Sequence, residues 1–405
     1  MSVNTDRSYK MKLRDVENAF KYRRIPYPKR SVELIALLAI SCTFFLFMHT
    51  NKLNSRLKEM EVKLQPSEFS ALGLTGNHIS GHDAGKHDDI NTLHGTYQYL
   101  KSTGQLHTLT PYKLNNTAKA EMDRIFFTRC AKVGSESLIQ FMEYLQHVND
   151  FDVDHTGLKQ PAKRQLLPRG QARKARYIYD QPAGTAYIEH TSWIDFNHFN
   201  MPKPIYINLV RDPVERVISW YYYVRNSYRN AIFYRKNPTA EIQPAAWFKK
   251  NYNDCVRSGD PECQYIPMTV KDVVGNFKRQ TLFFCGHHED CLPFDSPLAV
   301  QIAKRRVEEE YAVVGTWEET NITLTVLEHY IPRYFARATT IYPIFAEKLK
   351  NRNRNNRKPK VDEDVKAMVR RNFTNEYEFY HFCKQRLYKQ YIALKRSQLE
   401  QVYLS

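Results

Sequence analysis

Four apolar runs recur along the middle of this chain, and a polar turn follows each of them. The runs are RIFFT from Arg124, TAYIEHTSW from Thr185, PIYINLV from Pro204 and YAVVGTW from Tyr311. Segments with helical periodicity lie at 135–147, 213–225, 298–311, 321–331 and 360–400. Because strands that alternate with helices build parallel sheets covered on both faces, the pattern predicts an α/β fold with a central parallel sheet flanked by helices.

A further apolar stretch stands near the amino end, at residues 31–50. Within it, the segment from Leu34 to Met48 carries no charge, which is close to the lower limit of about 17 residues for a membrane-spanning helix. A cleaved signal peptide is the alternative. However, the preceding segment is 30 residues long, and no small-x-small cleavage site follows the apolar run. We therefore expect an uncleaved signal-anchor.

The charges around this stretch predict its orientation. Residues 1–30 hold nine Lys and Arg against three Asp and Glu, so the positive-inside rule predicts a cytoplasmic tail and a luminal remainder. A short span suits the thinner early secretory membranes, and we expect the Golgi. Residues 66–118 are rich in Gly, Ser, Thr, Asn and His and show little periodicity. We interpret 51–120 as a luminal stem and 121–400 as one folded domain.

The composition of the chain indicates an anionic partner. The chain has 405 residues, a hydrophobic fraction of 42% and a formal net charge of +17. The hydrophobic fraction is enough for a sizeable core and argues against wholesale disorder. The charge favours nucleic acid, a membrane surface or an acidic polymer as the partner.

The cysteines and sequons fit a luminal chain. Two pairs among the seven cysteines are close in sequence, Cys255 with Cys263 and Cys285 with Cys291. Neither pair has the CxxC spacing of zinc sites, so we expect two local disulfides in an oxidising compartment. No zinc, haem or flavin signature occurs, and no metal is expected. The sequons predict N-linked glycosylation at Asn115, Asn321 and Asn372.

The first polar turn has the features of an anion site. In TRCAKVGSES from Thr128, a strand enters, the chain turns around Gly134, and a helix leaves. Amides at a helix N-terminus bind anions, and Lys132 adds a full charge. A nucleoside triphosphatase loop requires GxxxxGK[ST], whereas Lys132 precedes Gly134 by two. Taken alone, the turn fits either a phosphate loop or a simple capped strand–helix connection.

A second turn favours the phosphate interpretation. In IYINLVRDPVERVISWYYY, Arg211 ends a strand-like run and Ser219 follows two helical turns later, so both could hold a second phosphate. The alternative is that Arg211 and Arg216 form surface ion pairs and that Tyr221–Tyr223 are core residues. Two phosphate sites without a magnesium Ser/Thr or a Walker B acid fit 3′-phosphoadenosine 5′-phosphosulfate, and they exclude a nucleotide kinase.

These motifs resemble those of the Golgi glycosaminoglycan sulfotransferases, and most of all the uronosyl and heparan sulfate 2-O-sulfotransferases. The same group shows segments similar to HTSWIDF from His190, FFCGHHEDC from Phe283 and VGTWEE from Val314. The motifs occur in the family's order between about 121 and 385. The resemblance implies a P-loop-like sulfotransferase fold and metal-free sulfo transfer from 3′-phosphoadenosine 5′-phosphosulfate to a glycan hydroxyl, the 2-O of a uronic acid. It also implies a homotrimer and no nucleic-acid partner.

The resemblance assigns roles to individual residues. His190 matches the catalytic base, although a lone His beside Trp193 would more often be structural. Lys132 stabilises the departing phosphate. The remaining donor-binding residues are Val133, Gly134, Ser135 and Ser137 for the 5′-phosphosulfate, with Arg211 and Ser219 for the 3′-phosphate.

The acceptor side follows the family less closely. Arg129 matches a residue that faces the acceptor in relatives, and Arg229 and Arg235 are further candidates, beside the basic segments 159–176 and 351–358. Arg suits carboxylates and sulfates, but solvated basic loops are an equal alternative. Glu136 and Ile188 depart from the family pattern, so the acceptor stays open: a glycosaminoglycan or a glycoprotein glycan. An inactive, membrane-anchored protein that binds anionic glycans is the alternative function. The intact set of Lys132, His190, Arg211 and Ser219 favours the enzyme.

Overall fold

A computed structural model describes Ser41, Thr43 and residues 48–50, 90–159, 165–270, 276–350 and 358–404. The chain divides into two units, Met1–Ala71 and Leu72–Ser405. The described residues of the first unit are helical. In the described part of the chain, no helix is both long and apolar enough to cross a bilayer. The expected cytoplasmic tail, nearly all of the expected signal-anchor and residues 51–89 lie outside the described residues.

The second unit is built on one parallel sheet. Its five strands run in the order β2-β3-β1-β4-β5. They are β1 (Arg124–Thr128), β2 (Asp152–Asp154), β3 (Thr185–Glu189), β4 (Ile205–Val210) and β5 (Tyr311–Thr316). Every residue of β3, β4 and β5 is buried, as continuous apolar runs in a sheet covered on both faces predict. The parallel sheet of the predicted α/β fold is therefore confirmed.

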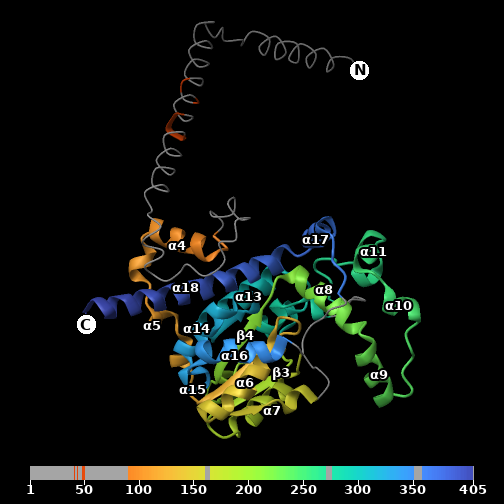
Figure 1. The fold of residues 1–405 in the computed structure, drawn as a ribbon, viewed down its shortest axis with the longest axis horizontal. Coiled ribbons are helices and arrows are strands. Elements are labelled where there is room, and N and C mark those ends of the chain that lie inside the picture. The colour runs from red at the N-terminus through yellow and green to blue at the C-terminus, as the bar shows by residue number, and fades with distance from the viewer. Residues whose placement is uncertain are drawn as a thin grey trace, which may run out of the picture. The chain divides into compact units, whose positions relative to one another are not determined.

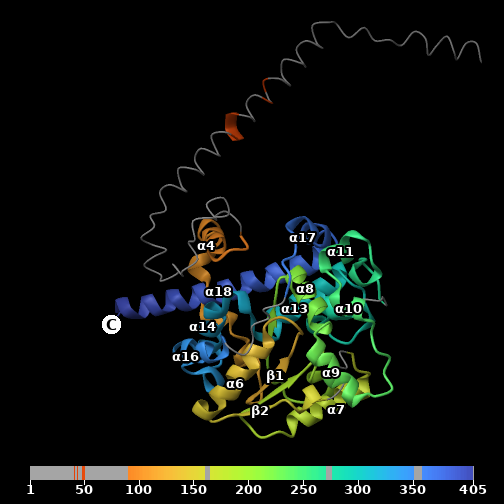
Figure 2. The same cartoon turned by 45° about the vertical axis from the view of Figure 1, so that its right-hand side comes forward.

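Helices pack on both sides of this sheet (Figures 1 and 2). Those whose cavity or core contacts matter below are α6 (Ser135–Asn149), α7 (Pro168–Tyr179), α8 (Pro213–Val224), α9 (Ser227–Lys236), α12 (Thr281–Cys285), α13 (Pro297–Glu309) and α18 (Thr374–Leu404). The others are α4 (Leu93–Ser102), α5 (Pro111–Leu114), α10 (Ala245–Lys249), α11 (Tyr252–Arg257), α14 (Thr320–Tyr330), α15 (Pro332–Phe335), α16 (Ala338–Lys350) and α17 (Glu363–Arg370). Helices α13, α14 and α18 all contact β5.

The carboxyl ends of four neighbouring strands meet at one edge of the sheet. Arg129, His190, Arg211 and Trp317 each follow directly on the last residue of β1, β3, β4 and β5. The register keeps these ends level, because Thr128 pairs with Glu189 and Val210 pairs with Thr316. In open parallel sheets, ligands bind outside this edge. The topology thus gathers the sequence motifs in one place.

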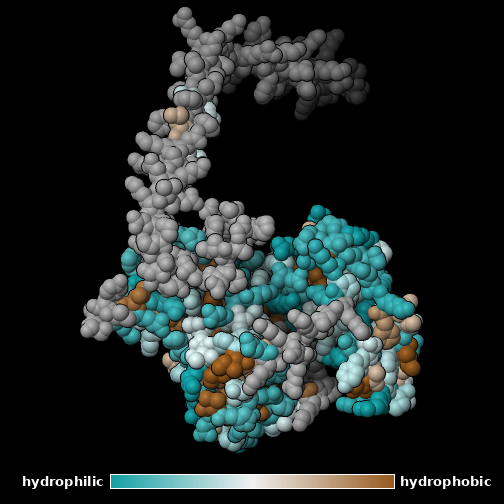
Figure 3. All heavy atoms as spheres, viewed as in Figure 1, coloured by the Kyte–Doolittle hydropathy of each residue, from teal (hydrophilic) through white to brown (hydrophobic). Residues whose placement is uncertain are grey.

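The described part of the expected stem 51–120, residues 90–120, contains helices that pack against the rest of the folded unit. Helices α4 and α5 fold there and pack against α18, the blue helix beside the orange segment in Figure 1. The side-chain amide of Asn116 donates to the carbonyls of Glu308 and Tyr311 at 2.8 and 2.9 Å. These contacts are long-range, so periodicity within the segment could not reveal them. The visible face of the Leu72–Ser405 unit is mainly hydrophilic (Figure 3).

Several element boundaries differ from the expected ones. Strand β3 ends at Glu189, so His190 lies in the following turn rather than in a strand. The short strand β2 was not predicted, because three residues of alternating Asp and Val carry little signal. The expected helix 360–400 is two helices, α17 and α18, separated at 371–373. Both predicted disulfides, Cys255–Cys263 and Cys285–Cys291, are present, while Cys130 and Cys383 are buried thiols.

Candidate active site

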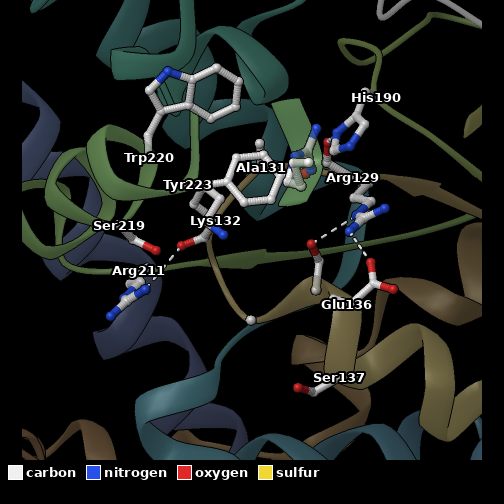
Figure 4. Close-up of a pocket in the computed structure, with 13 residues that line it drawn as sticks. Arg129, Ala131, Lys132, Glu136, Ser137, His190, Arg211, Ser219, Trp220 and Tyr223 are labelled. Atoms are coloured by element: carbon white, nitrogen blue, oxygen red, sulfur yellow. Dashed lines mark hydrogen bonds and ion pairs between the residues drawn. The ribbon is translucent and has the colours of Figure 1, made fainter. Parts of the chain in front are cut away.

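A cavity of about 570 Å³ lies at the carboxyl edge of the sheet. The turn between β1 and α6, the residue after β3, the residue after β4, the second half of α8 and the start of α9 all contribute to it. Figure 4 shows the side chains that enter it. The lining residues are Arg129, Ala131, Lys132, Gly134, Ser135, Glu136, Ser137, His190, Arg211, Ser219, Trp220, Tyr223 and Arg229. Three sequence motifs that are far apart in the chain therefore form one site.

The turn before α6 has a backbone that only a few residue types accept. Lys132 and Gly134 have φ angles of 64° and 87°. A Cβ on Gly134 would lie 2.6 Å from Cβ and Cγ of Trp317, which follows β5. Gly134 is thus required both by its left-handed backbone and by the close approach of the indole. The turn leads directly into α6, whose first N–H groups are a general anion-binding feature.

Lys132 lies among other cations. Its Nζ is 3.9 Å from the centroid of the Tyr223 ring, and the guanidinium carbon of Arg229 is 3.7 Å from the same centroid. Two cations this close to one centroid must lie on opposite faces of the ring. Burial, together with the charges of Arg211, Arg229 and Arg129, lowers the pKa of Lys132 to about 8. An incoming anion would relieve this repulsion, which favours anion binding here.

Arg211 and Ser219 lie on one side of Lys132 (Figure 4). Nη1 of Arg211 donates to the carbonyl oxygen of Lys132 at 3.3 Å, and its Nη2 is 3.8 Å from Glu215. Gln280 fixes the Arg211 backbone from both sides, since its Oε1 accepts from the N–H at 3.3 Å and its Nε2 donates to the carbonyl at 3.0 Å. The residue after β4, with its backbone held by Gln280, therefore presents a guanidinium to the cavity, and the second half of α8 presents a hydroxyl.

His190 lies on the other side of Lys132 (Figure 4). Its Nδ1 is 2.9 Å from the carbonyl oxygen of Arg129. A carbonyl only accepts hydrogen bonds, so Nδ1 carries the proton of the neutral ring. The lone pair is then on Nε2, which is the form needed to accept a proton from a hydroxyl.

Arg129 forms an ion pair that the sequence did not predict. Its Nε donates to Oγ of Ser135 at 2.9 Å, and its Nη2 donates to Oε2 of Glu136 at 2.6 Å. Ser135 in turn donates to the carbonyl of Cys130 at 3.1 Å. Burial lowers the pKa of Arg129, and the Glu136 charge opposes that shift. Ser135 therefore contacts Arg129 as well as shaping the turn.

The other expected site residues divide into those at the cavity and those away from it. Ser137 and Arg229 line the cavity. Val133 and Ile188 are fully buried and are not among the lining residues that the structure describes. Arg235 is exposed at the end of α9, outside the lining. Of the chain's basic segments, residues 160–164 and 351–357 lie outside the described residues.

Two aromatic residues at the cavity are not among the predicted site residues, since Tyr223 stayed a core residue in the alternative interpretation and Trp220 received no assignment. Trp220 and Tyr223 line it, and Trp220 stacks on Phe277 with ring centroids 4.9 Å apart. The signal was present in the spacing, because Ser219 and Tyr223 are four residues apart and so share one face of α8. Neighbouring Arg225, by contrast, is buried, with its guanidinium 2.6 Å from Glu262. It is a structural residue rather than an acceptor contact.

A possible metal cluster and the sequons lie elsewhere. Cys255, Asp260 and Glu262 place ligand-type atoms within 4.8 Å of one another, but Cys255 is already in a disulfide and offers no thiolate. Asn321 and Asn372 are exposed. Asn115 is half-buried, and its side chain accepts from the N–H of Thr117. Glycosylation at the three positions stays a prediction.

Comparison with known proteins assigns the family. Residues 115–383 match the sulfotransferase family. The chain belongs to this family. The sulfotransferase is 48% identical to the uronyl 2-sulfotransferase homolog pip of Drosophila melanogaster, with 97% of this chain and 95% of that protein covered. It is 28% identical to human heparan sulfate 2-O-sulfotransferase 1 over 70% of this chain and 76% of that protein. With heparan sulfate 2-O-sulfotransferase hst-2 of Caenorhabditis elegans it shares 26% identity, and 67% and 81% are covered. These matches make the chain a sulfotransferase enzyme.

Proposed function

We propose that this sulfotransferase moves a sulfo group from 3′-phosphoadenosine 5′-phosphosulfate to a hydroxyl of an anionic glycan, the 2-O of a uronic acid. The acceptor would be a glycosaminoglycan or a glycoprotein glycan. One observation carries the proposal: the cavity holds two cationic groups, Lys132 and Arg211, on the side away from His190 (Figure 4). A donor with two separate phosphates and a nearby proton acceptor match that arrangement.

The donor would be bound through both of its phosphates. Arg211 and the Ser219 hydroxyl are suited to the 3′-phosphate, since charge-assisted hydrogen bonds to phosphate are the strong ones. The turn from Lys132 to Ser137 is suited to the 5′-phosphosulfate, because it combines an ammonium group with the first N–H groups of α6. The match with the sulfotransferase family supports this donor.

The transfer step assigns one task to each side of the cavity. The acceptor oxygen forms a bond to sulfur while the bond between sulfur and the bridging phosphate oxygen breaks. Nε2 of His190 takes the hydroxyl proton, and the electron pair stays on the phosphate oxygen. The Lys132 ammonium is placed to stabilise that oxygen as its negative charge develops. The products are the sulfated glycan and adenosine 3′,5′-bisphosphate.

The acceptor class is supported by the relatives and by charge. Two of the relatives named above carry heparan sulfate 2-O-sulfotransferase in their names. In this chain, Arg129 and Arg229 line the cavity and are the acceptor contacts that we propose, with the exposed Arg235 further along α9. The formal net charge of +17 fits an anionic polymer.

The cellular setting is proposed from the amino-terminal segment. We propose a single-pass type II protein of the Golgi membrane, with a cytoplasmic tail at 1–30, an anchor at 31–50 and a luminal domain. The basic tail before an apolar run supports this orientation. A homotrimer, which the family resemblance implies, is part of the same proposal.

A His190→Ala variant tests the reaction. We expect transfer to fall by about 10²–10⁴-fold, the usual contribution of a general base, while the fold and donor binding survive. The assay uses labelled donor with desulfated glycans and extracellular glycoproteins, beside thermal shifts with and without adenosine 3′,5′-bisphosphate. His198→Ala is the matched control, because His198 is exposed and outside the cavity lining.

The outcomes separate the parts of the proposal. If His190→Ala keeps more than about a tenth of the turnover, another residue is the base and the mechanism falls. Lys132→Ala should lose both turnover and some donor affinity, since Lys132 would touch the phosphosulfate. If the wild-type chain binds the glycans but transfers nothing to any of them, the alternative of an inactive glycan-binding protein is correct.

A further inference from the structure

The ion pair between Arg129 and Glu136 lies at the edge of the cavity, and Glu136 is exposed to solvent. Nη2 of Arg129 lies 2.6 Å from Oε2 of Glu136, and the two side chains are 14% and 60% exposed. Both residues line the cavity. Figure 4 shows the Glu136 carboxylate directed at the Arg129 guanidinium, with His190 above the same guanidinium. The carboxylate is therefore accessible to a molecule that enters the site.

The pair is not needed to hold Arg129 in place. The Arg129 backbone N–H donates to the carbonyls of Phe127 and Glu189, each at 2.8 Å, and its Nε donates to Ser135. Glu136 sits in the first turn of α6, where its charge is favourable with or without Arg129. Glu136 therefore changes what Arg129 can bind more than where Arg129 lies.

The Arg129–Glu136 ion pair lies where the acceptor would bind, an assignment that rests on the function proposed above. The acceptor hydroxyl must reach His190 to give up its proton. The Arg129 carbonyl accepts the hydrogen bond from the His190 ring, so the two residues are adjacent. Arg211 and Ser219 lie on the other side of Lys132 (Figure 4). An anionic group on the acceptor sugar would thus meet Arg129 with Glu136 already bound to it.

We propose that Glu136 is a specificity-determining residue, which lowers the preference for acceptors that carry an anionic group on the sugar whose hydroxyl reacts. A carboxylate or sulfate on the sugar must displace Glu136 before it can bind the Arg129 guanidinium. Until then, the negative charge of Glu136 repels that group. A sugar without a charge at that position loses nothing. Like-charge juxtaposition of this kind is a general means of discriminating between ligands.

The test compares two oligosaccharides that differ in that charge alone. The first is a heparosan oligosaccharide, which has one carboxylate in each disaccharide, and the second is its carboxyl-reduced form. Affinities are measured by calorimetry with adenosine 3′,5′-bisphosphate saturating. We expect Glu136→Gln to strengthen binding of the heparosan oligosaccharide by about tenfold, the size of one charge-assisted contact, and to leave the carboxyl-reduced form unchanged.

The chain offers a closely matched control. Arg396 and Glu400 form an ion pair at 2.7 Å with side chains 20% and 62% exposed, on α18 and outside the cavity lining. Glu400→Gln should leave both affinities unchanged. In an Arg129→Ala background, Glu136→Gln should give much less than its tenfold gain, because the guanidinium that it releases is absent.

Four results would overturn the proposal. These are an equal change for both oligosaccharides, no change for either, a change confined to the bisphosphate affinity, and no binding of either oligosaccharide to any variant. The first and third would make Glu136 a structural residue of the turn. Turnover with labelled donor is measured separately. Charge-dependent binding without any sulfo transfer would contradict the proposed function and leave the role of Glu136 intact.

Discussion

At the residue scale, the chemistry of the cavity depends on how much positive charge it concentrates. Lys132, Arg129, Arg211 and Arg229 all line it, and the charges of the three guanidinium groups contribute to the lowered pKa of Lys132. Tyr223 separates Lys132 from Arg229 and gives each a favourable contact with its ring. These clustered cations repel one another, and a bound dianion would offset that repulsion.

The lowered pKa of Lys132 predicts an alkaline limit to activity. The ammonium is charged below its pKa of about 8 and loses its charge as the pH rises through that value. Because the protonated form would stabilise the departing phosphate, kcat/KM for the donor should fall on the alkaline side with an apparent pKa near 8. A pH profile of kcat/KM measures this. Lys132→Arg should remove this alkaline fall in kcat/KM, since a guanidinium stays charged. If the fall persists in the Lys132→Arg variant, another group causes it.

Arg211 and His190 should separate donor binding from acceptor activation. We expect Arg211→Ala to weaken binding of adenosine 3′,5′-bisphosphate by roughly 1.5–3 kcal/mol, because a charge-assisted contact to the 3′-phosphate is lost. His190→Ala should leave this affinity nearly unchanged, since the ring lies on the other side of Lys132 (Figure 4). Calorimetry on the two purified variants decides the matter, and equal affinities would remove Arg211 from the 3′-phosphate site.

The sequence predicted some of these residues and not others for a physical reason. Lys132, Arg211 and His190 follow strands in recognisable motifs, and a parallel sheet brings strand ends together. Gln280 holds the Arg211 backbone from 69 residues away, and nothing near Arg211 in the sequence reports that contact. The pairing of Arg129 with Glu136 depends on side-chain directions around a tight turn, which spacing alone does not give.

At the element scale, α18 supports the cavity from behind the residues that line it. Glu376 accepts hydrogen bonds from the N–H groups of Gln280 and Thr281, and Gln280 holds Arg211. Tyr377 donates to Asp212, at the N-terminus of α8, at 2.8 and 2.9 Å. Helix α18 thus connects Arg211, through Gln280, and Asp212 to the core. A substitution that disturbs α18 should therefore also disturb the proposed donor site.

Glu376 predicts a pH dependence of stability. It is fully buried, and burial raises its pKa from the usual 4.5 to about 7. A folded-state pKa above the unfolded one means that the neutral form stabilises the fold at low pH, and that this stability is lost as the pH rises toward about 7. The loss is on the order of 3 kcal/mol. Glu376→Gln cannot titrate, so its free energy of unfolding should fall less steeply over this range.

Urea unfolding at a series of pH values measures that difference. Glu378→Gln is the matched control, because Glu378 lies two residues further along α18 and is exposed, with Lys304 as its partner. The control should keep the wild-type pH dependence. If Glu376→Gln keeps it as well, the buried carboxylate is ionised throughout and its hydrogen bonds outweigh its burial.

Periodicity was a good guide to the elements around the sheet and a poor one at the edges of the domain. The runs that became β1, β4 and β5 were expected within one residue, since continuous apolar runs are typical of buried parallel strands. Residues 90–119 have a polar composition, although α4 buries Tyr97 and Leu100 and contacts α18. Composition alone therefore made a folded segment look like a stem.

At the scale of the whole molecule, the disulfides and the basic amino-terminal segment bear on the compartment. Two disulfides, Cys255–Cys263 and Cys285–Cys291, each close a short loop. Such disulfides form in an oxidising lumen. Asn321 and Asn372 are exposed on the Leu72–Ser405 unit and open to glycosylation. The proposed type II orientation would place all of these features on one side of a membrane and residues 1–30 on the other.

Protease treatment of sealed microsomes tests this orientation. With nine Lys and Arg before the apolar run, residues 1–30 should stay cytoplasmic, so added protease should remove only the tail. The domain from about residue 121 to the end should survive and should become sensitive once detergent opens the vesicles. Shortening by deglycosylation would report use of Asn115, Asn321 or Asn372 inside the lumen. Digestion of the domain in intact vesicles would reverse the assignment, and an amino terminus that begins after residue 50 would show that the apolar run is a cleaved signal peptide.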